Sequence, residues 1–173
     1  MPDVGKTIAA LQQVVEAAGQ AQSAARQLDG RAQQVQSRAG ANGFRGVADR
    51  VGAARNRLKQ IREMQGGVAA TAKCTAEMVR RVTEDMSPAD VVSTLAPAAQ
   101  QLGSASTAAS ATTAELDKLA AEIAAALRGG QPGPLIGLVN QVKQAMVRVV
   151  AGLGTAKKTV DDTITAAQQT GNF

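Results

Sequence analysis

The sequence predicts an all-α protein in which four long antiparallel helices form two tandem hairpins within one elongated bundle or coiled coil. Apolar residues recur at alternating steps of three and four in four long stretches, a spacing that keeps one stripe of a helix against a partner helix. The second pair of stretches repeats the register of the first at an offset of 88 residues. Short breaks rich in Gly, Pro and Ser separate the stretches, as expected for turns between helices.

The first hairpin is expected over residues 1–87, with helices over 3–39 and 44–86 and a turn near 40–46. Gly40 and Gly43 allow the positive φ angles of a helix end and a tight reversal. Gly66-Gly67 disfavours helix but does not interrupt the apolar spacing, so we expect one helix there. The predicted seam residues are Val4, Thr7, Leu11, Val14, Ala18, Ala21, Ala25, Leu28, Ala32, Val35 and Ala39, then Phe44, Val47, Val51, Ala54, Leu58, Ile61, Val68, Ala72, Thr75, Val79 and Val82.

The second hairpin is expected over residues 88–173, with helices over 88–128 and 134–169 and a turn near 129–134. Ser87 can cap a helix that begins at Pro88, with Asp90 in the position of a capping box. Pro97 should kink or restart this helix. The predicted seam residues are Val92, Leu95, Ala99, Leu102, Ser106, Ala109, Thr113, Leu116, Ala120, Ile123 and Leu127, then Leu135, Val139, Val142, Met146, Val149, Leu153, Ala156, Val160, Thr163 and Ala167. Two separate hairpins, each awaiting a partner, are the alternative arrangement.

The composition argues against catalysis. The chain has no histidine, one cysteine and only 1% aromatic residues, so the usual general base and the commonest metal ligand are missing. Aromatic side chains that could wall a substrate pocket are also scarce. We therefore expect no enzyme activity, no cofactor, no metal site and no small-molecule substrate.

Neither a cleavable secretory signal nor a transmembrane segment is expected. The start of the chain lacks a basic region followed by an apolar core, and no run of about 18 apolar residues exists. The expected compartment is the cytoplasm, and export without a signal peptide stays open.

Positive charge gathers in the first half of the chain. Between Arg26 and Arg62, nine basic residues face only Asp29 and Asp49, a local net charge of +7. Three interpretations stay open: a solvated rim of the seam, a docking face for an acidic partner, or a weak site for nucleic acid or an anionic membrane. The candidate docking residues are Arg45, Arg50, Arg55, Arg57, Lys59 and Arg62.

The tripeptide Phe44-Arg45-Gly46 lies at the first reversal. An aromatic-x-Gly tripeptide in the turn of a helical hairpin resembles the Trp-x-Gly turn of the small ESX-type (WXG family) proteins of type VII secretion. The length of the hairpin and its Ala/Gln-rich helices resemble that family too. The chain departs from the family in having no Trp in the turn and no Tyr for the Tyr-x-x-x-Asp/Glu export signal. The resemblance implies a non-enzymatic helical protein, with Phe44 and Gly46 as its turn motif.

The leading hypothesis is a non-enzymatic helical interaction or scaffold protein that binds a protein partner or itself, linked to a secretion or assembly system. One alternative is an amphipathic surface coat, phasin-like or membrane-associated, because long helices with thin cores can open at an interface. Another is a basic architectural protein that binds nucleic acid through salt-sensitive backbone contacts.

Overall fold

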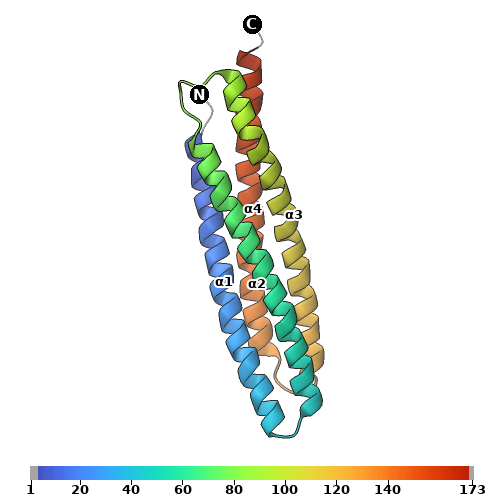
Figure 1. Cartoon of the computed structure of the whole chain (residues 1–173). Coiled ribbons are helices and arrows are strands. Elements are labelled where there is room, and N and C mark those ends of the chain that lie inside the picture. Colours follow the sequence, from blue (N-terminus) through green and yellow to red (C-terminus); the bar gives the residue numbers. More distant parts are fainter. Residues whose placement is uncertain (1–3, 172–173) are drawn as a thin grey trace.

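The computed structural model describes residues 4–171, which fold into four helices and, within that range, no strand. The helices are α1 (Val4–Ala41), α2 (Arg45–Arg80), α3 (Pro88–Ala126) and α4 (Gly133–Thr170). They run up and down in turn as an elongated four-helix bundle (Figure 1). The predicted all-α fold is confirmed. The expected helix start at Asp3 and the terminal Phe173 lie outside the described residues.

Each helix packs against two neighbours. The packed pairs are α1 with α2, α2 with α3, α3 with α4, and α1 with α4, so the helices form a closed ring. One hydrophobic cluster draws residues from all four helices. The two hairpins therefore lie side by side around a shared core instead of standing apart.

The predicted seams of α1, α2 and α4 are buried with few exceptions. All ten predicted positions of α4 are buried. In α2 the seam passes through Gly66-Gly67 without a break, as expected. It contains two buried polar residues, the predicted Thr75 and Gln65, which the predicted seam left out. The prediction of Phe44 as a seam residue is wrong, because Phe44 is 63% exposed and contributes nothing to the core.

The predicted seam of α3 is half wrong. Leu95, Leu102, Ala109, Leu116 and Ile123 are buried as expected. At each of the other predicted positions, the residue one place earlier is buried instead. A helix in a bundle contacts two neighbours, and the more apolar flank of its stripe is the one that becomes buried. The flank that is buried has one polar residue, whereas the predicted flank has two, Ser106 and Thr113. The residues buried in place of the predicted ones are Val91, Ala98, Ala105, Thr112, Leu119 and Ala126.

Helix α2 ends at Arg80, six residues before the predicted end at residue 86. The chain must reverse between antiparallel α2 and α3, and Ser87 takes an extended conformation (ψ 153°) before Pro88, as the residue before a proline prefers. Residues 81–87 therefore serve as a linker. As predicted, Ser87 caps α3: its Oγ accepts a hydrogen bond from the Asp90 backbone N–H at 3.2 Å and donates to Asp90 Oδ2 at 2.6 Å.

Pro97 does not restart α3, which is one helix from Pro88 to Ala126. Pro97 lies on the exposed face, where water can satisfy the carbonyl that its missing N–H leaves unpaired. The helix can therefore continue past it.

The 88-residue repeat is clearest in α2 and α4. Nine of the ten buried positions of α2 have a buried counterpart 88 residues later in α4. The tenth, Ala76, corresponds to the half-buried Ile164. Buried Thr75 and Thr163 are equivalent and bond alike, each donating its hydroxyl to the carbonyl four residues earlier.

Candidate interaction surface

The predicted docking residues all lie in α2, but they face different neighbours. Arg55 and Arg62 face α1, where both meet Asp29. Arg55 Nε donates to Asp29 Oδ1 at 2.8 Å, and Arg62 Nη1 lies 3.8 Å from Asp29 Oδ2. Arg55 Nη1 also donates to Gln36 Oε1 at 3.0 Å. These two arginines therefore tie α2 to α1.

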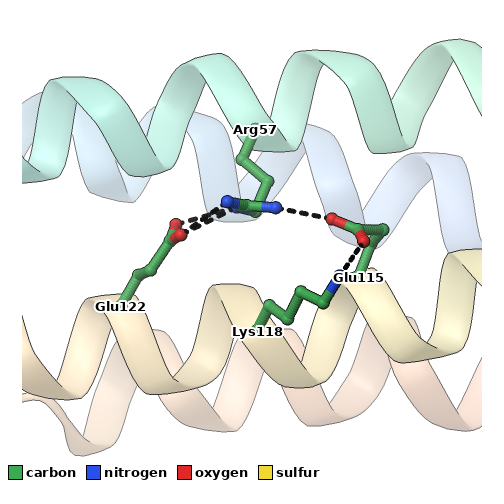
Figure 2. Close-up of polar contacts among 4 residues, drawn as sticks. All are labelled: Arg57, Glu115, Lys118 and Glu122. Carbon is green, nitrogen blue, oxygen red and sulfur yellow. Dashed lines mark hydrogen bonds and ion pairs between the residues drawn. The ribbon is translucent and has the colours of Figure 1, made fainter.

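Arg57 lies on the other flank of α2 and faces α3, as Figure 2 shows. Its guanidinium donates to Glu115 Oε2 at 2.6 Å and to both carboxylate oxygens of Glu122 at 2.9 and 3.0 Å. Lys118 donates to the other oxygen of Glu115 at 2.7 Å. The hydrogen bonds to Glu122 and Glu115 raise the pKa of Arg57, and those from Lys118 and Arg57 lower the pKa of Glu115. Arg57 thus joins the first hairpin to the second.

Arg45, Arg50 and Lys59 remain exposed and form no ion pair within residues 4–171. Of the six predicted docking residues, these three keep their charge available at the surface. The net charge of +7 counted between Arg26 and Arg62 overstates the accessible positive charge, because that count includes acidic residues of the first hairpin alone. Glu115 and Glu122 were missed, although their spacing of seven places both on one flank of a helix.

A polar groove of about 650 Å³ runs between α1 and α2. Its lining includes Arg55, Lys59 and Arg62, together with Asp29 and Asp49. A second groove of about 390 Å³ adjoins it and shares Lys59 and Arg62 while adding Arg26 and Glu63. We call the two together the α1–α2 groove. With four cations and three carboxylates, its net charge is only +1, far below the +7 counted along the sequence.

The turn between α1 and α2 is a Schellman motif. Phe44 N–H donates to Ala39 C=O at 2.8 Å and Gly43 N–H donates to Gly40 C=O at 3.1 Å, the two bonds that define this helix ending. Gly43 has φ +79°, so it is the glycine that the turn requires. Gly46, the glycine of the predicted turn motif, instead lies in the first turn of α2 with open space around it.

Phe44 occupies the position that follows the left-handed glycine. A residue there usually packs back on its helix, yet Phe44 is 63% exposed. The turn holds the backbone of Phe44 by hydrogen bonds and presents its ring to solvent.

A family of unknown function (DUF6244) matches residues 86–172. The chain belongs to this family. The matched segment begins in the linker before α3 and includes all of α3 and α4, so the DUF6244 match coincides with the second hairpin. No curated protein and no solved structure matches the chain.

Two further observations concern the described residues. Within residues 4–171, no group of three or more Cys, Asp and Glu side chains is placed to hold a metal ion. None of the four helices is long and apolar enough to cross a membrane.

Proposed function

We propose that this DUF6244 protein is a non-enzymatic helical scaffold that binds an acidic segment of a protein partner along the α1–α2 groove. The observation that carries the proposal is Lys59, an exposed cation that forms no ion pair within residues 4–171 and lines both parts of the groove. Arg62, beside it, meets Asp29 only at 3.8 Å. An incoming carboxylate would meet Lys59 and the weakly held Arg62, which both line the two parts of the groove.

The surface around the groove favours a protein partner. Gln22 and Gln36 line it from α1, and most of the other glutamines of α1 are exposed. Uncharged polar side chains do not repel an approaching helix, whether that helix is acidic or basic. The few cations of the groove then set the orientation of the bound helix. The lining holds no aromatic ring on which a nucleic-acid base could stack, which favours protein over single-stranded nucleic acid.

A link to ESX-type secretion is the second part of the proposal. It rests on the resemblance of Phe44-Arg45-Gly46 to the aromatic-x-Gly turn of that family. Support comes from the antiparallel hairpin on which this tripeptide lies and from the exposure of Phe44. In a bacterium with such a system, the protein is expected in the culture medium, and disabling the secretion machinery should retain it in the cells.

The partner experiment compares Lys59→Glu with a matched control. Tagged wild-type protein should recover a specific partner from extracts of its native host, identified by mass spectrometry. Lys59→Glu should reduce that recovery at least about tenfold, the scale expected for reversing one interfacial charge. Lys158→Glu reverses an exposed charge on α4 that forms no ion pair in the described structure, and it should not change recovery. Equal recovery by all three proteins would refute docking in the groove.

A further inference from the structure

The two ends of the bundle carry opposite charge. The α1–α2 turn and the α3–α4 loop lie at one end, and the 81–87 linker lies at the other with the start of α1 and the end of α4 (Figure 1). We call these the turn end (residues 36–52 and 123–140) and the linker end (residues 4–10, 77–95 and 161–171). The turn end has four arginines and one aspartate, net +3, and the linker end has three basic and six acidic residues, net −3.

The charges of the turn end are not neutralised internally. Its arginines form no ion pair within residues 4–171 and all are exposed. Phe44 lies at the same end and is one of two large hydrophobic side chains exposed in the described structure. The turn end therefore carries one exposed aromatic side chain and four exposed cations, which are Arg38, Arg45, Arg50 and Arg128.

The linker end has the complementary shape and charge. An apolar groove of about 780 Å³ opens there between the linker and the ends of α1, α3 and α4. Its lining includes Val82, Met86, Pro88 and Val91, with the carboxylate of Glu84 beside them. Asp85 follows Glu84, and both are exposed without an ion pair in the described structure.

We propose that the protein assembles head to tail, with Phe44 of one copy seated in the linker-end groove of the next copy. The cations around Phe44 then face Glu84 and Asp85 across the contact. This deepens the proposed function and rests on it, because it names a second copy of the chain as a binding partner of the scaffold. When the contact is end-on, along the long axis of the bundle, each pair of molecules joins one turn end to one linker end, and the product is an open linear chain.

The contact should be weak and reversible. The tip of a bundle buries less surface than a standard protein interface, which places it among transient contacts. We expect a dissociation constant of roughly 10 µM to 1 mM. Salt should weaken the association, because the opposing charges are at the surface.

The test is sedimentation velocity of the purified full chain over that concentration range. The wild-type mass should rise with concentration. Phe44→Asp should lower the association constant about 10- to 100-fold, as expected for losing one buried aromatic side chain. Aspartate also suits the N-cap of α2, so the fold should survive, and circular dichroism can confirm that. The double variant Glu84→Lys/Asp85→Lys should weaken association similarly.

Mixing the two variants gives the sharpest result. Phe44→Asp keeps an intact linker end, and Glu84→Lys/Asp85→Lys keeps an intact turn end. Each alone should associate about 10- to 100-fold more weakly than wild type, and an equimolar mixture should form a heterodimer with the wild-type affinity that grows no further. Two matched controls, Val147→Asp at the other large exposed hydrophobic residue and Glu16→Lys at an exposed acid of α1 outside both ends, should associate like wild type.

Three outcomes would overturn head-to-tail assembly. One is a wild-type protein that stays monomeric over the whole range. Another is a mixture that gives no heterodimer. The third is a monomeric protein that binds vesicles of anionic phospholipid through Phe44, which would identify a membrane as the occupant. Because this test needs no other protein, its failure can be distinguished from a failure of the partner recovery that Lys59→Glu tests.

Discussion

Arg57 on α2 and Glu115 on α3 form an ion pair of 2.6 Å between the two hairpins of the chain. The pair lies on the flank of the α2–α3 seam, where charges commonly set the pairing of helices. Lys118 reaches the same carboxylate from one turn further along α3 (Figure 2). Glu115 is thus held in its charged form by two cations, one from each hairpin.

This arrangement predicts a pH dependence of stability. The folded state lowers the pKa of Glu115 below its ordinary value of 4.5, chiefly through Lys118 and then Arg57. The unfolded chain therefore takes up a proton at higher pH than the folded one. The stability that the charged group contributes is complete above about pH 4.5 and is lost as the pH falls through the lowered pKa.

We expect Glu115→Gln to be less stable than wild type at pH 7, and the difference should disappear as the pH falls below 4.5. Urea unfolding followed by circular dichroism at several pH values measures it. Glu16→Gln changes an exposed acid without an ion pair in the described structure and should match wild type throughout. A difference for Glu115→Gln that persists at pH 2 would contradict the assignment.

The second prediction concerns Gln65, whose side chain is fully buried while neither its amide N nor its amide O has a hydrogen-bond partner in the described part of the chain. Its counterpart 88 residues later in α4 is the buried Leu153. An unsatisfied buried polar group destabilises by roughly 1–3 kcal/mol. We expect Gln65→Leu to raise the free energy of unfolding by about that amount, measured by urea unfolding.

The reverse substitution provides the control for Gln65. Leu153→Gln places the same amide in the equivalent position of α4, and it should destabilise by roughly 1–3 kcal/mol. If Gln65→Leu lowered the stability instead, the amide of Gln65 would have to be satisfied by ordered water.

The third prediction separates the two glycines of the first turn. Gly43 has φ +79°, a conformation that destabilises a residue with a Cβ by about 1–2 kcal/mol. Gly46 is helical with open space around it, where alanine stabilises by about 0.4–1 kcal/mol. Gly43→Ala should therefore lower the melting temperature and Gly46→Ala should raise it. Equal effects would show that the turn is not the Schellman motif described above.

Most of the fold could be predicted from the sequence because it depends on local patterns. The spacing of apolar residues located the seams of α1, α2 and α4 and half of the seam of α3, and the Ser87–Pro88–Asp90 signal located the start of α3. The errors arose where the outcome depends on a neighbouring helix. The side on which α3 is buried is set by contacts with both α2 and α4, and the end of α2 is set by the length of linker that reaches Pro88.

The candidate site was less predictable for a similar reason. Counting charges along the chain identified the basic residues of α2 but could not assign their partners. Arg57 pairs with Glu115 and Glu122, which lie 58 and 65 residues later. Their pairing depends on α3 packing beside α2. The exposure of Lys59 and of Phe44 also depends on how the helices pack in the assembled bundle.

The last prediction tests the packing of the two hairpins along α1 and α4. Gly152 of α4 lies so close to α1 that a Cβ would come within 2.6 Å of Val14 Cγ2. Gly154, two residues later in the same helix, has open space around it. We expect Gly152→Ala to destabilise by about 1–3 kcal/mol through overpacking, whereas Gly154→Ala should stabilise by up to about 1 kcal/mol through helix propensity. Thermal and urea unfolding measure both. Helix propensity alone would make the two variants equally stabilised, and that result would mean that α1 and α4 do not pack in solution. The opposite signs are expected because only Gly152 lies where the two hairpins meet.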